Sequence, residues 1–409
     1  MATKQNHFFL ILILGSLTAL GPFSIDMYLP SFPAIAKDLD TTIERVALSL
    51  SSYFVGISLG QLLYGPLLDK FGRKKPLYIG LAVYLLASFG CMMVSTVDGL
   101  IGLRFIQAIG SCAAAVAAVA MVRDLFPVEE NAKVFALLML VVGVSPMVAP
   151  AVGGYVTKHL GWHAIFLILA GIAVIILLAV IFALPDKYVP NRKLSLRPAP
   201  MLSNFAQVLK NPQFFTYVLT GALSFAGLFT YVAGSPLVFM QMYKVSEDVY
   251  GWIFAGLSVG FIGSSQVNSW MLKRGLTSQQ IVPVALTVQI VAGLVFILVA
   301  MSGWMGLTGI IIMLFVVLSC IGIISPNASA LSLAPFSHNA GTASALMGAL
   351  QLGLGAVASM GIGFFHALTA IPLASIMAAT AVLAGVAYMV GKRAIKQPIA
   401  ASEAGIALH

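Results

Sequence analysis

Apolar runs of about 20 residues, separated by short polar stretches, follow one another along almost the whole chain. An α-helix needs about 20 predominantly apolar residues to cross a bilayer, so each run predicts one membrane span. Twelve runs are expected, at residues 8–29, 45–66, 77–96, 100–121, 133–155, 162–184, 213–235, 249–271, 281–301, 305–325, 341–364 and 372–391. The pattern therefore predicts an all-α membrane protein.

Composition supports this prediction, and the charges orient the spans. The chain is 60% hydrophobic and 9% charged with a mean hydropathy of +1.01, whereas a soluble domain is about 25% charged. If both ends lie on one side of the membrane, that side holds 17 of the 22 Lys and Arg residues, the other holds four, and Arg104 lies within a span. Basic loops are cytoplasmic, so both termini are expected in the cytoplasm. The net charge of +9 thus indicates topology, and no nucleic-acid partner is expected.

The chain divides near its middle. Residues 185–212 contain five prolines and five Lys or Arg residues and form the one long polar connection. We expect an N-terminal six-helix bundle at 1–184, a cytoplasmic linker at 185–212, a C-terminal six-helix bundle at 213–392 and a cytoplasmic tail at 393–409. The segments FVGISLG (54–60) and FAGLSVG (254–260) each head a span that ends in a basic loop, which favours duplication of one half.

Several motifs lie in the spans where a known family carries them. The loop after the second span reads GPLLDKFGRKKP (65–76), the fourth span reads LRFIQAIG (103–110), and the fifth reads SPMVAPAVGG (145–154). They resemble the loop signature, the membrane-embedded arginine and the antiporter signature of major facilitator transporters. The segment SIDMYLP (24–30) and the pair Arg123–Asp124 are similar to the Bcr/CflA branch of drug-resistance exporters. One departure is Ala149, where antiporters more often have glycine.

The resemblance implies a fold and a mechanism. The fold is that of two parallel six-helix halves with a central site between them. The mechanism is export of a drug in exchange for protons, without any cofactor besides the proton motive force. A proton-coupled exporter of an endogenous metabolite and an uptake symporter would share the fold. A membrane enzyme is not expected, because no clustered catalytic side chains, phosphate loop or metal-ligand spacing is present.

The loop after the second span is expected to act as a cytoplasmic latch. Glycines would flank its tight turn. The family resemblance implies that Asp69 meets a helix start near Gly341 in the opposite half and that Arg73 pairs with Asp124. The neighbouring lysines are expected to serve topology. The expected latch residues are Gly65, Asp69, Gly72, Arg73, Arg123 and Asp124.

The fifth span combines helix breakers with small residues. Pro146 and Pro150 lie one helical turn apart and each removes a backbone hydrogen bond, so the helix should bend there. Gly153 and Gly154 would let a neighbouring helix approach closely. Tight packing and a hinge that seals against leak are both consistent with this pattern.

Asp26 and Arg104 are the expected proton-coupling pair. A carboxylate at membrane depth costs about 2.5–3.5 kcal/mol or more and is by default a functional-site hypothesis. Asp26 lies about 27 Å along the first span and Arg104 about 6 Å below the outer surface, so both belong to the outer half of the membrane. Two structural alternatives remain: an acid at the membrane surface where the helix ends, and a static salt bridge.

The substrate is expected to be a small amphipathic antibiotic such as bicyclomycin, an amphenicol or a sulfonamide, and the transporter a monomer in the lipid bilayer. Candidate contacts are polar groups and aromatic rings that could line an apolar cavity, although aromatic residues in spans more often face lipid or neighbouring helices. These candidates are Asp26, Tyr28, Arg104, Phe225, Phe229 and Tyr231. No metal site is expected.

Overall fold

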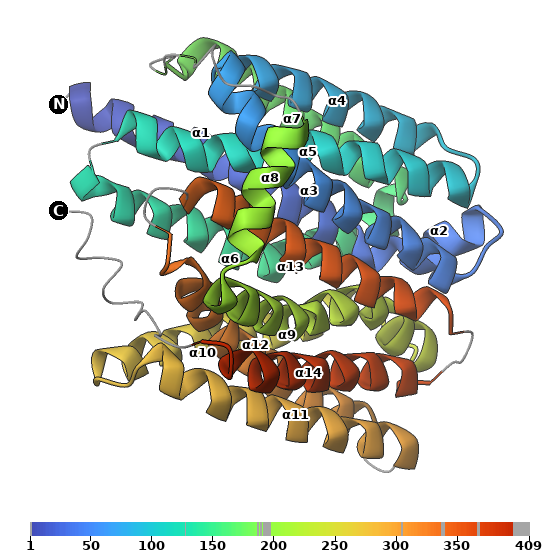
Figure 1. Cartoon of the computed structure of the whole chain (residues 1–409). Helices are drawn as coiled ribbons and strands as arrows, with labels where there is room; N and C mark the ends of the chain where they lie inside the picture. The colour runs from blue at the N-terminus through green and yellow to red at the C-terminus, as the bar shows by residue number, and fades with distance from the viewer. Residues whose placement is uncertain are drawn as a thin grey trace. The chain divides into compact units, whose positions relative to one another are not determined.

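The computed structural model describes residues 2–126, 128–185, 188, 190, 198–303, 306–336, 340–365 and 369–395 (Figure 1). All regular secondary structure in these residues is helical. Eleven of the described helices or helix pairs are long and apolar enough to cross a membrane. The all-α membrane fold expected from the sequence is therefore present.

The chain forms two compact units. The first comprises Met1–Leu196 together with Ser246–Phe254, and the second comprises Arg197–Val245 together with Ala255–His409. The first unit contains α1 (Ala2–Asp26), the 3₁₀ turn η1 (Leu29–Ser31), α2 (Phe32–Asp38), α3 (Ile43–Phe71), α4 (Lys74–Met93), α5 (Val97–Leu125), α6 (Val128–Leu160) and α7 (His163–Ala183).

The second unit begins within the expected linker. It contains α8 (Pro198–Leu209), α9 (Pro212–Pro236), the π turn η2 (Leu237–Met242), most of α10 (Glu247–Lys273), α11 (Ser278–Ser302), α12 (Gly306–Leu333), α13 (Ala340–Gly363) and α14 (Ile371–Lys392). The first turns of α10 belong to the first unit, where the Lys158 ammonium at the end of α6 donates to Asp248 over 3.0 Å.

Two elements differ from the expectation. Part of the polar connection is the helix α8, because Val208 and its neighbours have apolar partners in α9 and α13. The expected eighth span is the helix α10, but it falls short of the apolarity of the other eleven. Glycines, serines, Gln266 and Asn268 are interspersed along it and lower its hydropathy.

Of the two glycines in the loop motif, Gly72 is required by the turn after α3 and Gly65 is not. Gly72 ends α3 with φ +87°, a conformation that glycine adopts without steric cost. Gly65 lies inside α3, six residues before its last residue Phe71, so the expectation that it flanks the turn is wrong. The turn is tighter than the motif suggested, because α3 continues through Pro66 and the acidic Asp69 to Phe71.

Small residues fix α5 between α3 and α4. A Cβ atom at Gly110 of α5 would lie 2.5 Å from the Tyr84 backbone nitrogen of α4. A Cβ atom at Gly56 of α3 would lie 2.6 Å from the Phe105 carbonyl oxygen of α5. Such close backbone approach is typical of membrane helix packing. It holds the middle of α5, and with it Arg104, in a defined position.

Candidate functional site

Arg104 is a fully buried cation in the first unit, with 0% of its surface exposed. Its Nη1 donates to Gln107 Oε1 one turn along α5 over 2.5 Å. Its Nη2 donates to the backbone carbonyl oxygen of Ser24 in α1 over 2.9 Å. Its Nε has no hydrogen-bond partner. The guanidinium is thus held by neutral groups and keeps one donor unused.

Aromatic rings surround this guanidinium. Its carbon lies 4.2 Å from the ring centroid of Tyr53 and 4.5 Å from that of Tyr28, with Phe166 at 5.9 Å. Cation–π contacts of this kind contribute about 2 kcal/mol or more when they are shielded from water. We call Tyr28, Tyr53 and Phe166 the aromatic cage. The cage draws on the turn after α1, on α3 and on α7, and it stabilises the charge without a carboxylate.

A network of neutral side chains extends from the cage. Gln107 Nε2 donates to Ser88 Oγ over 2.7 Å, and the Ser24 and Tyr84 hydroxyls are hydrogen-bonded over 2.7 Å. The Tyr28 hydroxyl shares a hydrogen bond of 2.7 Å with Ser49. These bonds fix Gln107, Ser24 and Tyr28, and each of these residues contacts Arg104 directly.

Asp26 is the last residue of α1 and is 5% exposed. It makes no ion pair with Arg104, so the expected pairing is wrong in this structure, as is the alternative of a static salt bridge. Its carboxyl faces the Ser145 hydroxyl of α6, which has no hydrogen bond of good geometry. Asp26 is buried in the protein at the residue where α1 ends, and the alternative of an acid at the membrane surface stays open.

Arg104 lies level with the end of α1, but it meets a different side of that helix from Asp26. Arg104 touches Ser24 and Tyr28, which flank Asp26 in the sequence. Two residues along an α-helix correspond to a rotation of about 200°, so Asp26 and Ser24 lie on nearly opposite sides of α1. Arg104 approaches the Ser24 side, whereas Asp26 faces α6.

The antiporter motif packs against the end of α1. A Cβ atom at Gly153 would overlap the carbonyl oxygen of Met27, the residue after Asp26. The Ser31 and Thr157 hydroxyls join the same two segments through a hydrogen bond of 2.6 Å. Gly154 lies against the first residue of α10, where a Cβ atom would be 3.0 Å from the Glu247 carbonyl oxygen. The two glycines thus serve close packing on different neighbours.

The helix α6 continues through Pro146 and Pro150 from Val128 to Leu160. Neighbouring helices can compensate for the lost hydrogen bonds in a membrane. Ser145 and Pro146 lie in the part of α6 that faces Asp26, and the glycine pair lies two turns further on. The motif therefore spans the contact between the buried acid and the end of α1.

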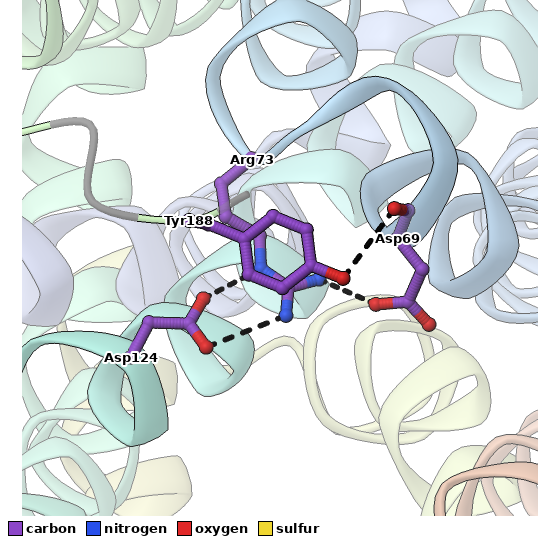
Figure 2. Close-up of polar contacts among 4 residues, drawn as sticks. All are labelled: Asp69, Arg73, Asp124 and Tyr188. Carbon is purple, nitrogen blue, oxygen red and sulfur yellow. Dashed lines mark hydrogen bonds and ion pairs between the residues drawn. The ribbon is translucent and has the colours of Figure 1, made fainter. Parts of the chain in front are cut away.

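The expected latch contains a compact ion-pair cluster in the first unit (Figure 2). Arg73 Nε donates to Asp124 Oδ2 over 2.6 Å, and Arg73 Nη1 donates to Asp69 Oδ1 over 2.6 Å. Arg73 is 9% exposed. Burial lowers its pKa, but the two carboxylates outweigh that effect and leave the pKa above its usual value. The expected pairing of Arg73 with Asp124 is present.

Two parts of the expected latch stay predictions. The side chain of Arg123 lies outside the described residues. A contact between Asp69 and the helix start near Gly341 would join the two units, so it stays a prediction. A residue that the sequence did not single out, Tyr188, stacks on Arg73 (Figure 2).

The predicted aromatic contacts fall in different units. Tyr28 belongs to the aromatic cage. Phe225, Phe229 and Tyr231 lie on α9, where the Phe225 and Phe229 rings are 5.3 Å apart. Phe229 is buried against Gly355 of α13, where a Cβ atom would overlap its ring. A role of these α9 rings in substrate binding stays a prediction.

Sequence reasoning missed several residues of the site. Tyr53 and Phe166 belong to no recognised motif. The sequence indicates only that a buried arginine needs aromatic or polar partners, and not which residues these are. Glu44, in the first turn of α3, is a second buried acid of the first unit. Its place at a helix start, where the dipole favours negative charge, was a signal that the sequence did contain.

Comparisons with known proteins agree with this architecture. Residues 14–360 match the model of the Major Facilitator Superfamily. The chain is 33% identical to the Bicyclomycin resistance protein homolog of Haemophilus influenzae, over 95% of this chain and 97% of that protein. It is 27% identical to the Multidrug resistance protein MdtL of Vibrio parahaemolyticus, over 82% and 84% of the two chains.

A solved structure gives the same result for the fold. A bacterial homolog of the human lysosomal transporter Spinster matches 95% of this chain and 98% of its own with a TM-score of 0.72, at 15% identity. The family model covers most of the chain, and a relative named for drug resistance covers nearly all of it. The chain therefore belongs to the Major Facilitator Superfamily, as a multi-pass membrane transporter of the Bcr/CflA drug-resistance type and not an enzyme.

Proposed function

We propose that this transporter is a drug:proton antiporter of the bacterial inner membrane, with both termini in the cytoplasm. It expels small amphipathic antibiotics such as bicyclomycin, amphenicols or sulfonamides by alternating access. It works as a monomer and uses the proton motive force without a cofactor. The names of the bicyclomycin-resistance and multidrug-resistance relatives support drug export.

The observation that carries the proposal is a pair of buried, opposite charges that are not joined. Asp26 and Arg104 lie in the same bundle, at the same depth of α1, but on different sides of that helix. Burying an isolated charge is costly unless the group is paired or neutralised. Arginine keeps its charge throughout the physiological range, whereas a carboxyl can take up a proton. The acid is therefore the group that we assign to proton transfer.

The Arg104 geometry supports a second role in polar recognition. Its Nε is an unused donor in a buried cage of aromatic rings. A neutral amphipathic drug with a carbonyl or hydroxyl acceptor could gain a hydrogen bond there and stack on an aromatic ring. In this proposal the substrate and the proton compete through the end of α1, because protonation of Asp26 changes the charge on the same segment that Arg104 contacts from its other side.

The proton motive force is sufficient for such an exchange. One proton moved through about 100 mV and one pH unit releases roughly 2.3 and 1.4 kcal/mol. Together these values correspond to a drug gradient of several hundredfold at a stoichiometry of one. We assign Asp69, Arg73 and Asp124 to a cytoplasmic latch that breaks and re-forms in each cycle.

The test is drug-dependent proton flux in proteoliposomes. Asp26→Asn keeps the side-chain volume but removes the titrating group, so flux with bicyclomycin should fall to the level of empty liposomes. Asp98→Asn is the matched control, because Asp98 is exposed and forms an ion pair with the exposed Arg45. Export of a neutral drug by Asp26→Asn, driven by a pH difference alone, would refute the assignment. Glu44→Gln then tests the second buried acid.

A further inference from the structure

We infer that Tyr188, in the linker, is a positioning residue of the cytoplasmic latch, and that the start of the linker docks on the latch only while the Arg73 ion pairs are closed. The inference rests on the proposed role of Asp69, Arg73 and Asp124 as a latch. It adds a fourth residue and a third segment of chain to that device.

The geometry places Tyr188 directly on the latch arginine (Figure 2). The Arg73 guanidinium carbon lies 3.7 Å from the centroid of the Tyr188 ring. The Tyr188 hydroxyl donates to the backbone carbonyl oxygen of Asp69 over 3.4 Å. Tyr188 thus touches the cation through its ring and the end of α3 through its hydroxyl, five residues after α7 ends at Ala183.

The planar guanidinium explains why both kinds of contact are compatible. Its N–H groups lie in the plane and point at Asp69 and Asp124, while its face is free to stack on a ring. A stacked ring displaces water from that face, and a lower local dielectric strengthens the ion pairs at the edge. Arg73 is 9% exposed although the Asp69 side chain beside it is 51% exposed. Tyr188 is therefore well placed to cover the cation.

A second linker contact lies next to the first. A Cβ atom at Gly72 would be 3.3 Å from Cγ of Pro190, so the linker also lies against the turn that positions Arg73. Tyr188 and Pro190 therefore hold this stretch of linker at two neighbouring points of the same loop. Any movement that takes Arg73 away from Asp124 removes the surface on which Tyr188 stacks. The linker start is then docked in one latch state and released in the other.

The predicted consequence is a change in latch equilibrium without a change in substrate contacts. Tyr188→Ala removes the ring and the hydroxyl, so it should destabilise the closed latch and slow turnover. Tyr188→Phe keeps the stacking ring and should behave nearly like the parent. A residue that acts on the latch alone should lower kcat for drug-driven proton exchange and leave KM unchanged.

The decisive measurement is limited trypsin digestion of the purified full-length transporter, which needs no substrate. Cleavage after Arg192 or Lys193, followed by mass spectrometry, reports how often the linker is released, since proteolysis follows local opening. Tyr188→Ala should raise this cleavage rate about two- to thirtyfold, the range of a lost cation–π contact. Tyr188→Phe should stay within about twofold. Phe182→Ala is the matched control, because Phe182 lies in the last turn of α7 and is 83% exposed.

A double-mutant cycle ties the effect to Arg73. Arg73→Ala should raise cleavage by itself, and Tyr188→Ala should add nothing in that background, because the two changes remove one contact. Additive effects, or an unchanged cleavage rate in Tyr188→Ala with a monodisperse protein, would overturn the docking. Faster cleavage with unchanged kcat would show that Tyr188 anchors the linker without serving the latch, which also refutes the inference. Since digestion is independent of transport, these outcomes are distinct from failure of the proposed antiport.

Discussion

At the scale of single residues, the unusual feature is an arginine that is buried without an acid. Arg104 obtains two hydrogen bonds from neutral oxygens and stacks between rings. Breaking such an arrangement leaves polar groups unpaired at membrane depth, where no water replaces the lost partner. The cage thus stabilises the fold around Arg104. It also leaves the Arg104 Nε–H group without an acceptor, so this group could bind a ligand.

Arg104→Lys tests whether the shape of the cation matters and not only its charge. A lysine ammonium cannot donate in the fork geometry that reaches Gln107 and Ser24 together, and it stacks poorly on Tyr53. We expect drug-dependent proton flux to fall at least about tenfold and the melting temperature in detergent to fall by several degrees. Arg45→Lys is the control, because that arginine forms an exposed pair with Asp98. Parental flux in Arg104→Lys would show that charge alone suffices.

The residue scale also shows the limit of prediction from the sequence. Counting residues placed Arg104 level with the end of α1, where it contacts Ser24 and Tyr28, because the rise per residue in a helix is constant. The side of α1 on which Asp26 lies was not predictable, since α1 is apolar on all sides and carries no amphipathic signal. The partners of a buried charge depend on that side, so the assumed ion pair between Asp26 and Arg104 was wrong.

At the scale of elements, the contact between α6 and the end of α1 joins the antiporter motif to the buried acid. Gly153 is the point of closest approach, because its missing side chain makes room for the Met27 carbonyl oxygen. Ser145 faces Asp26 from the same helix. Any displacement of α6 therefore changes the surroundings of Asp26, which is how a motif defined by small residues can influence a charged site.

Gly153→Ala probes this contact. The added methyl group would overlap a backbone carbonyl oxygen that cannot rotate away, so α6 must move from α1 at a cost of about 1–3 kcal/mol. We expect a lower melting temperature in detergent and a loss of most drug-driven proton flux. Gly171→Ala in α7 is the control, because nothing lies within 4 Å of its added Cβ and alanine favours the helix. Equal stability of the two variants would contradict the proposed packing role.

The elements were predicted better than their connections. Apolar length located the spans, because a bilayer imposes that length on every one of them. The helix α8 was hidden in a segment rich in proline and basic residues, since Val208 and its neighbours gain apolar partners only after folding. The ion pair of Arg73 with Asp124 was predicted from the loop motif, whereas Tyr188 lies in a linker with no motif and was found only from its contact with Arg73.

At the scale of the whole molecule, the distribution of basic residues predicts the orientation of the chain in the membrane, which the fold alone does not. Chains of opposite orientation would contain the same helices and the same aromatic cage. Orientation follows from the imbalance of 17 to four Lys and Arg residues between the two sides, which is a property of the loops. It also decides which side of the membrane the latch faces and from which side Asp26 would receive its proton.

Cysteine labelling in intact cells measures this orientation. The native cysteines Cys91, Cys112 and Cys320 are buried, so they should give little background with a membrane-impermeant maleimide. Because the side richer in Lys and Arg stays in the cytoplasm, Asp98→Cys, at the start of α5, should react from outside in intact cells. Lys75→Cys, beside the latch, should react only after the membrane is permeabilised. Labelling of Lys75→Cys in intact cells would place the latch outside and exclude its proposed cytoplasmic role, whatever drug the protein transports.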